Sequence, residues 1–213
     1  RINLIFEGSS EIMRLFIARE AVDQHFSIAF PIVDPKSSMA TRITYLMKAA
    51  PFYLRWYPGT WISSMKSYHG FGRLETHLEY LDRATRRLGR SIFHAMVRFG
   101  PQLEKRQMVL FRAVDIGAEL YAMASTISRA KMLAEQGNAE AMELAEVFCR
   151  ESRDRVEASF RALYGEHDAA LYRLAQRVVQ GEHAWLENGI VDEVDLGAAA
   201  VAAGAGGRVV VGV

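Results

Sequence analysis

The second half of the chain is dominated by a hydrophobic repeat of helical period, and this repeat most restricts the fold. Between residues 73 and 99, apolar side chains recur three, four and seven positions apart, the spacing of one face of an α-helix. These side chains are Leu74, Leu78, Leu81, Leu88, Ile92, Met96 and Phe99. The arginines of the stretch fall largely outside this row and are expected on a solvated face. The sequence therefore predicts an amphipathic helix with one packed side.

Three more predicted helices continue the pattern, over residues 101–134, 139–164 and 168–180. The first carries two adjoining apolar stripes, which is typical of a helix at the centre of a bundle. Cys149 falls on the inward stripe of the second, where a free thiol behaves as a small hydrophobic side chain. The third is expected to turn Leu171, Leu174 and Val178 inward. The sequence thus predicts an all-α protein.

Two acids, Asp115 and Glu119, interrupt the stripes of the central helix one turn apart. We expect them to pair with arginines at the edge of the apolar surface, where Arg112 is close, and not to form an active site. No histidine or cysteine pattern accompanies them, and the histidines of the chain show no metal-ligand spacing, so no metal site is predicted.

The composition narrows the class of protein. The chain has 213 residues, of which 50% are hydrophobic and 24% charged, enough for one good core or two small ones. A net charge of +1 makes nucleic-acid binding the weakest interpretation, so no nucleic-acid partner is predicted. The single cysteine excludes an internal disulfide framework and fits a reducing compartment. The first residue is Arg and no signal peptide precedes the first motif, so we interpret the chain as the later part of a longer protein.

Residues 36–73 differ from the rest of the chain, because no Asp or Glu occurs between Asp34 and Glu75. The cations of the stretch are Lys36, Arg42, Lys48, Arg55, Lys66 and Arg73, and its aromatic residues are Tyr45, Phe52, Tyr53, Trp56, Tyr57, Trp61, Tyr68 and Phe71. Two interpretations stand. Either the aromatic side chains pack on the protein core with the cations on its rim, or the segment lies on an anionic membrane surface, with Trp56 and Trp61 as anchors. The elements expected before residue 73 are a helix over 10–25, an extended linker over 26–36, and helices over 38–50 and 59–68.

The chemical motif of the chain is a carboxylate that stands between an apolar run and a glycine, just before a helix: Leu4-Ile5-Phe6-Glu7-Gly8-Ser9-Ser10-Glu11-Ile12. Gly8 permits a tight backbone path, and Ser9 and Ser10 are good helix N-caps. Desolvation among apolar groups raises the pKa of a carboxyl, which makes a glutamate a useful general base near neutral pH. Glu7 is therefore a candidate base. The alternative is an ordinary acid stabilised by the positive end of the helix.

Two stretches of the sequence resemble the acyl-CoA dehydrogenase family. The signature near the end of that family's core reads aromatic-Glu-Gly-Thr-x-x-Ile-x-Arg, followed by an apolar run that ends in Ala-Arg-Glu. The matching residues are Phe6-Glu7-Gly8-Ser9-Ser10-Glu11-Ile12 and Arg14-Leu15-Phe16-Ile17-Ala18-Arg19-Glu20. Ser9 replaces the threonine and keeps its hydroxyl. In some long-chain and isovaleryl branches the base lies elsewhere and this position is not acidic, so Glu7 argues against those branches.

The second stretch resembles the extra C-terminal helical domain of very-long-chain acyl-CoA dehydrogenases. Its residues are Asp115-Ile116-Gly117-Ala118-Glu119-Leu120-Tyr121-Ala122-Met123, Ser128-Arg129-Ala130 and Leu171-Tyr172-Arg173. The resemblance covers about residues 1–184 and is poor over 26–72. In the family, a membrane-associating segment lies between the core and the extra domain, which is where residues 36–73 fall.

The resemblance implies an FAD-dependent enzyme of fatty acid β-oxidation that converts an acyl-CoA substrate to the trans-2-enoyl-CoA. Glu7 would be the catalytic base that removes the α-proton. The substrate-binding residues would be Gly8 and Arg19, and the cofactor-binding residues would be Ser9, Ser10 and Glu11. For Arg19, a salt bridge near the helix C-terminus is the alternative. The resemblance also implies electron-transfer flavoprotein as the acceptor, a homodimer, and a location in the cytoplasm or on the mitochondrial matrix side, with a membrane surface as a further alternative.

The predicted organisation is the end of the acyl-CoA dehydrogenase helical bundle followed by a second helical bundle domain. Its parts are the last helix and catalytic loop of the core (1–25), a linker or membrane-associating segment (26–72), a C-terminal helical domain (73–195) and a disordered tail (196–213). Most of the flavin site would lie upstream, so the chain alone is expected to bind little flavin and to be inactive. The alternative function is a non-catalytic helical module for dimerisation or membrane docking, in which Glu7 is structural.

Overall fold

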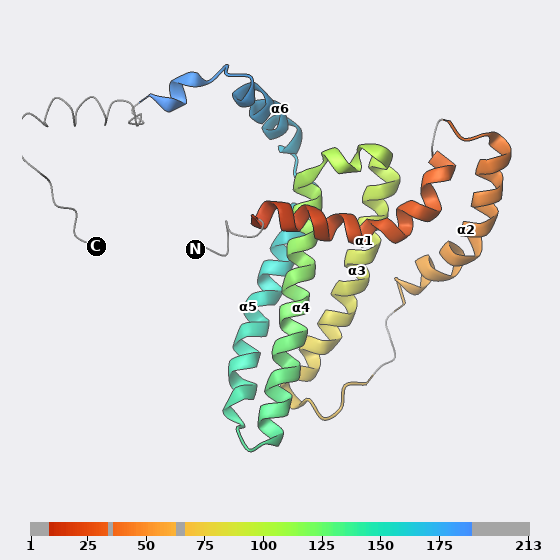
Figure 1. Cartoon of the computed structure of the whole chain (residues 1–213). Helices are drawn as coiled ribbons and strands as arrows, with labels where there is room; N and C mark the ends of the chain where they lie inside the picture. Colours follow the sequence, from red (N-terminus) through yellow and green to blue (C-terminus); the bar gives the residue numbers. More distant parts are fainter. Residues whose placement is uncertain (1–8, 34–35, 63–66, 189–213) are drawn as a thin grey trace, which may run out of the picture. The chain divides into compact units, whose positions relative to one another are not determined.

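The computed structural model describes residues 9–33, 36–62 and 67–188, and the regular secondary structure among them is all helical, as the sequence predicts (Figure 1). The α-helices are α1 (Ser10–Val33), α2 (Met39–Gly59), α3 (Glu75–Phe99), α4 (Gln107–Glu135), α5 (Glu140–Ala162) and α6 (Asp168–Val179). Short 3₁₀ helices cover Gly72–Leu74, Gly100–Lys105 and Ala184–Glu187. The chain divides into two compact units, Arg1–Gly165 and Glu166–Val213.

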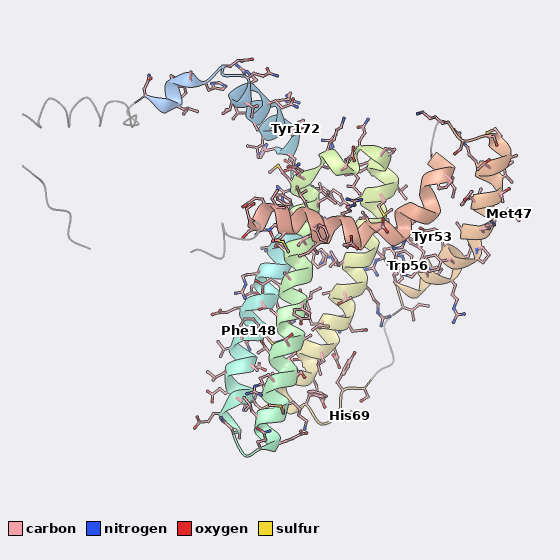
Figure 2. All side chains as sticks on the ribbon, in the orientation of Figure 1. Met47, Tyr53, Trp56, His69, Phe148 and Tyr172 are labelled. Carbon is pink, nitrogen blue, oxygen red and sulfur yellow. The ribbon has the colours of Figure 1, made fainter. Side chains whose placement is uncertain are left out.

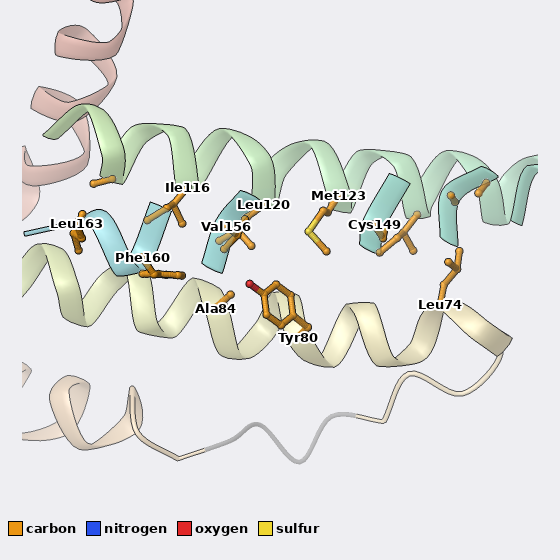
Figure 3. Packing of buried hydrophobic residues seen from close by; sticks show 14 of the residues in the cluster. Leu74, Tyr80, Ala84, Ile116, Leu120, Met123, Cys149, Val156, Phe160 and Leu163 are labelled. Atoms are coloured by element: carbon orange, nitrogen blue, oxygen red, sulfur yellow. The ribbon is translucent and has the colours of Figure 1, made fainter. Parts of the chain in front are cut away.

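The core of the first unit lies between α3, α4 and α5 (Figure 3). Among the described residues, helix α4 contacts both neighbours and contributes more buried side chains than any other helix, as expected for a helix at the centre of a bundle. Its buried residues Ile116 and Met123 point toward α3 and α5, where Val156 and Cys149 of α5 belong to the same cluster as Ile127 of α4. Burial of this continuous apolar surface is the main stabilising contribution to such a bundle. The prediction that Cys149 is a core residue is confirmed, and burial raises the pKa of its thiol to about 11.

The connection between α4 and α5 is a tight helix end built on Gly137. The backbone N–H of Asn138 donates to the carbonyl of Leu133, and the N–H of Gly137 donates to that of Ala134, both at 3.0 Å. This Schellman pattern requires a left-handed residue, and Gly137 has φ = +97°. The turn that the sequence predicts at Gly137-Asn138 therefore connects α4 to α5.

Helix α1 is longer than predicted, because it continues past His25 to Val33 and passes through Pro31. The extended linker predicted for residues 26–36 is therefore wrong over its first eight residues. Helix α1 contacts both α2 and α4, and these contacts extend the helix beyond what the proline signal alone would allow.

Helix α2 extends the first piece that the sequence predicts, over 38–50, as far as Gly59. The second piece, predicted over 59–68, is wrong at residues 60–62 and 67–68, which are not helical. Ser38 caps its start, since the Ser38 Oγ accepts the backbone N–H of Thr41 at 3.1 Å. The helix then passes through Pro51 and ends at Gly59. Residues 63–66, which include Lys66, lie outside the described part of the chain, as do 34–35.

The second unit contains α6, which ends in the same kind of turn at Gly181, with φ = +84°. The sequence predicts that its apolar row points inward. In the structure no residue of α6 is buried, and Leu171, Leu174 and Val178 are about half exposed. The predicted tail lies within residues 189–213, outside the described residues.

Candidate functional site

The predicted catalytic motif lies directly before α1. Glu7 and Gly8 are outside the described residues, and the description begins at Ser9. The carbonyl of Ser9 accepts the backbone N–H of Met13 at 3.0 Å, and its Oγ lies 3.5 Å from the backbone nitrogen of Ile12. Ser9 therefore stands at the N-cap position of α1, and the first turn of the helix presents unpaired amides next to the motif.

The predicted cofactor-binding residues occupy this first turn. Ser9 and Ser10 are half-buried, whereas Glu11 is exposed, with Oε1 4.0 Å from Nη1 of Arg14. Hydroxyl groups and free amides at a helix N-terminus suit a phosphate group. The carboxylate of Glu11 cannot face a phosphate favourably, so it suits the hydroxyl or amino part of a nucleotide. The chemistry of these described residues therefore suits the phosphate of a nucleotide and a neighbouring hydroxyl or amino group.

Arg19 is exposed on the third turn of α1, beside a groove of about 400 Å³ that Leu15, Asp23 and Glu104 also line. Because α1 continues to Val33, Arg19 lies in the middle of the helix and not near its C-terminus. The predicted alternative, a salt bridge near the helix C-terminus, is therefore wrong, because Arg19 does not lie near that end of α1.

Two ion pairs join α4 to the helices on either side of it. Arg14 of α1 donates from Nε to Oδ1 of Asp115 at 2.8 Å. One turn further along α4, Glu119 accepts two hydrogen bonds from Arg155 of α5, at 2.9 and 3.1 Å. Hydrogen bonding to Arg155 lowers the pKa of Glu119. The four side chains line one groove of about 650 Å³.

These pairs confirm that Asp115 and Glu119 bind arginines at the edge of the core. The recorded partners, however, come from α1 and α5, whereas the sequence pointed to the nearby Arg112. Arg112 donates to the backbone carbonyl of Leu163 at 3.4 Å. The sequence holds no signal for pairs that span 101 and 36 positions.

In the basic and aromatic segment, residues 36–73, some of the aromatic side chains pack against neighbouring helices. Tyr53 and Trp56 of α2 are half-buried against His25 of α1 and Phe93 of α3. The His25 Nδ1 lies 3.1 Å from the Tyr53 hydroxyl oxygen, and burial lowers the pKa of His25. Figure 2 shows Tyr53 and Trp56 on the side of α2 that is turned toward these helices. Trp56 is thus a packing residue, as the first of the two interpretations expects.

Another face of α2 is apolar and exposed. It is formed by a row at helical spacing: Met39, Ile43, Leu46, Met47 and Leu54. Leu54 is 75% exposed and Met47, labelled in Figure 2, is 69% exposed. Lys48 and Arg55 are exposed on the same helix. We call these five apolar residues the α2 apolar row.

The arginines of α3 do more than form a solvated face. Arg86 and Arg90 donate to the backbone carbonyls of Ile62 and Thr60, just beyond the end of α2. The guanidinium of Arg90 also lies 4.2 Å from the ring centroid of Trp61. These contacts attach α2 to α3, so the expectation of a purely solvated face is wrong for these arginines.

A buried polar cluster between α3 and α5 was missed by the sequence interpretation. His77 is 1% exposed, and its Nε2 lies 3.2 Å from Oε2 of Glu146. Its Nδ1 is buried with no hydrogen-bond partner. Nearby, the hydroxyl of Tyr80 donates to Glu157, which also accepts from Arg87. His77 stands next to Leu78 in the predicted apolar row, and that position was the available signal for a buried histidine.

Within the described residues, the side chains of His, Cys, Asp and Glu form no group of three that could hold a metal ion. None of the helices in that part of the chain is both long and apolar enough to cross a membrane.

Comparison with known proteins identifies the family. Residues 72–184 match the family model described as "ACAD9/ACADV, C-terminal domain". The chain is 44% identical over 199 residues to "Probable acyl-CoA dehydrogenase FadE10" of Mycobacterium tuberculosis and to the protein of the same name in Mycobacterium bovis. These alignments cover 91% of the chain and 31% of each relative. "Probable acyl-CoA dehydrogenase" of Bacillus subtilis is 26% identical over 165 residues, which are 74% of the chain and 24% of that protein.

The chain therefore spans about a third of the length of the mycobacterial relatives it matches. The matched domain begins in the 3₁₀ helix that leads into α3 and includes all of α4, α5 and α6. Because the family model covers more than half of its residues, the chain belongs to the acyl-CoA dehydrogenase family, as a C-terminal part that carries the ACAD9/ACADV C-terminal domain.

Proposed function

We propose that this chain is the C-terminal part of a flavin-dependent acyl-CoA dehydrogenase and that Glu7 is the base that removes the α-proton of the acyl-CoA. The observation that carries the proposal is an acidic motif immediately before the N-terminus of α1, in a chain that belongs to this family. Electron-transfer flavoprotein as acceptor and a homodimer belong to the same proposal.

The chemistry assigns separate tasks to the residues of the chain. An α-proton of a thioester is only weakly acidic, so the carboxylate of Glu7 must accept it while a neighbouring donor polarises the thioester carbonyl. The backbone N–H of Glu7 is the donor that the motif offers, and Gly8 lets the thioester approach the backbone closely. Ser9, Ser10 and the first-turn amides of α1 would hold the nucleotide part of FAD. Bound flavin would accept the hydride equivalent that leaves the β-carbon.

The test is Glu7→Gln in the intact dehydrogenase, with reduction of bound flavin by acyl-CoA measured in a single turnover. General base catalysis typically contributes about 10²–10⁴-fold, so the variant should lose at least that factor while it keeps its flavin. Glu20→Gln, an exposed acid later on α1, is the matched control and should react at the rate of the unmodified enzyme. Flavin reduction at the normal rate in Glu7→Gln would refute the assignment.

The chain spans about a third of its mycobacterial relatives, and most of the flavin site belongs, in this proposal, to the remaining part. We therefore expect the purified 213-residue chain to bind flavin weakly or not at all and to lack activity. A flavin absorbance band that co-purifies with this chain would contradict the expectation.

A second function, docking on an anionic membrane surface, is favoured by the α2 apolar row. An exposed apolar face on a helix that also carries exposed cations is typical of a helix that lies in a lipid interface. Each cation near an anionic surface contributes roughly 1 kcal/mol, so Lys48 and Arg55 would add salt-dependent attraction. Of the two predicted anchors, Trp61 is 61% exposed and available to lipid, whereas Trp56 is packed against α1 and α3.

Co-sedimentation with vesicles tests this second proposal. The intact protein should bind vesicles that contain phosphatidylserine more strongly than neutral ones, and binding should weaken with salt. Leu54→Asp should reduce the binding, whereas Leu144→Asp should not, although the two leucines are 75% and 74% exposed and differ mainly in their helix. Equal loss in both variants, or no preference for anionic vesicles, would refute docking through α2.

A further inference from the structure

We infer that Asp115, acting through Arg14, is a positioning residue for the motif at Glu7. The ion pair between α4 and α1 fixes the first turns of the helix that follows the motif directly. The inference rests on the proposed function, because it takes Glu7 as the base. It gives the C-terminal domain a part in the reaction, although Asp115 touches neither substrate nor cofactor.

The pair joins elements that are far apart in the sequence but meet beside the motif. Arg14 Nε and Asp115 Oδ1 are 2.8 Å apart, and the residues are separated by 101 positions. Arg14 stands four residues after Ser10, the first residue of α1, so its side chain acts on the second helical turn. Its guanidinium carbon is 6.0 Å from the ring centroid of Phe111, which lies one turn before Asp115 on α4. A charged hydrogen bond and an aromatic ring thus hold the same arginine from one side.

Apolar packing alone leaves the orientation of α1 loosely determined. Ala18 of α1 is buried against the bundle, but beside it a partly open apolar groove of about 370 Å³ lies between α1, α3 and α4. Hydrophobic contact is not directional, and an incompletely filled contact permits the helix to slide or rotate. A hydrogen bond is directional. At the N-terminal end of α1, the Arg14–Asp115 pair therefore supplies an angular restraint that the apolar contact with α4 lacks.

We expect the motif at Glu7 to depend on the Arg14–Asp115 pair, because Glu7 and Arg14 are close together in the sequence. Two residues, Gly8 and Ser9, separate Glu7 from the start of α1, and a chain extends by no more than about 3.6 Å per residue. A rotation of the first turns of α1 is therefore carried into the motif. Proton abstraction requires the reacting atoms at about 3–3.5 Å, and a displacement of about 1 Å can reduce the rate by about 100-fold.

The second ion pair of α4, between Glu119 and Arg155, provides a control for this inference. Glu119 and Arg155 make the same kind of contact one turn further along, with hydrogen bonds of 2.9 and 3.1 Å. That pair joins α4 to α5 and does not involve α1. All four side chains are partly exposed, and partly exposed ion pairs contribute little to overall stability. Loss of either pair should therefore leave the protein folded, and only loss of the Arg14–Asp115 pair should affect the motif.

The experiment compares Asp115→Asn with Glu119→Gln in the intact dehydrogenase, with flavin bound. Single-turnover reduction of the flavin by acyl-CoA is followed over a range of substrate concentrations, so that the limiting rate constant is separated from substrate affinity. We expect Asp115→Asn to lower the limiting rate constant by about tenfold or more with little change in affinity, and Glu119→Gln to leave both unchanged. Asp115→Glu, which keeps the carboxylate, should restore most of the rate.

Each outcome decides the inference. An equal fall in Asp115→Asn and Glu119→Gln, a fall that appears only in affinity, or no fall in Asp115→Asn would overturn it. Where Asp115→Asn fails to fold, Arg14→Lys takes its place, because lysine keeps the charge but not the guanidinium Nε donor. Glu7→Gln, measured in parallel, separates the two proposals. A normal rate of flavin reduction in Glu7→Gln refutes Glu7 as the base. A greatly reduced rate in Glu7→Gln together with a normal rate in Asp115→Asn refutes only the positioning role.

Discussion

The buried histidine between α3 and α5 predicts a specific dependence of stability on pH. Burial lowers the pKa of His77, and the nearby carboxylate of Glu146 offsets this only in part. The other charged groups that act on it are Arg150 and Arg153 of α5, which oppose protonation. The neutral ring donates one hydrogen bond to Glu146. The protonated ring would add a buried N–H with no acceptor at Nδ1.

The sign and the size of the effect follow from linkage. In the unfolded chain His77 titrates near its ordinary value of 6.5, and in the folded chain it titrates lower. The stability that it contributes is therefore present above pH 6.5 and is lost as the pH falls below that value. Between about pH 7.5 and 5.5, the loss of stability from this one group is at most about 1.4 kcal/mol, because the unfolded chain takes up its proton around the ordinary value.

The assay is urea unfolding of the 213-residue chain at about pH 7.5 and 5.5, with His77→Gln beside the unmodified chain. Glutamine keeps an amide donor for Glu146 and does not titrate, so the free energy of unfolding should fall less with pH in this variant. His69→Gln is the matched control, because the His69 side chain is 90% exposed, and it should leave the pH dependence unchanged. If His77→Gln and the unmodified chain lose the same free energy over this pH range, burial does not hold His77 neutral and the reasoning is refuted.

Two further predictions concern the stability of the same chain, measured as the free energy of unfolding in urea. Met123→Ala removes a side chain of α4 that is 0% exposed and should cost about 2–5 kcal/mol, whereas Met47→Ala, in the exposed α2 apolar row, should change stability by no more than about 0.5 kcal/mol. Gly117→Ala should stabilise the chain by about 0.5–1 kcal/mol, because the added Cβ would meet Leu88 Cδ2 at an ordinary 3.7 Å and alanine favours the helix. Gly137→Ala should destabilise it, since Gly137 has φ = +97°. The opposite sign for either glycine would show that the local backbone differs from the structure.

The helices of the bundle were predictable because their signals are long and uninterrupted. The repeat of apolar residues over 73–99 and the double stripe over 101–134 correspond to α3 and α4. Most of the predicted row of α3 is only partly buried and packs against the core, whereas the buried residues of this helix are His77, Tyr80, Ala84 and Ala95. Boundaries were less predictable. The helix expected to begin at residue 101 starts as the 3₁₀ helix Gly100–Lys105, and α4 itself begins at Gln107. Helix ends depend on a few local hydrogen bonds, which the hydrophobic pattern does not encode.

Helices α1 and α2 were predicted too short for a different reason. Pro31 and Pro51 are strong local signals for a break, and each removes one backbone hydrogen bond from a helix. The two helices pack against each other, with the ring of His25 stacked on that of Tyr53. A tertiary contact of this kind can outweigh a local preference, and it is invisible in a window of sequence. The same limit applies to Asp115, whose partner Arg14 no local pattern could indicate.

The two proposed functions depend on separate surfaces, so they can be tested one at a time. The catalytic proposal depends on the motif before α1 and on the Arg14–Asp115 pair, whereas the docking proposal depends on the α2 apolar row. Helix α2 is attached to the rest of the protein by a different face, through Tyr53, Trp56 and the backbone carbonyls held by Arg86 and Arg90. Because these attachments do not involve the exposed row, Leu54→Asp should weaken vesicle binding without slowing flavin reduction by a soluble acyl-CoA. Glu7→Gln should have the opposite pair of effects, and a single variant that removed both activities would mean that docking and catalysis share a surface.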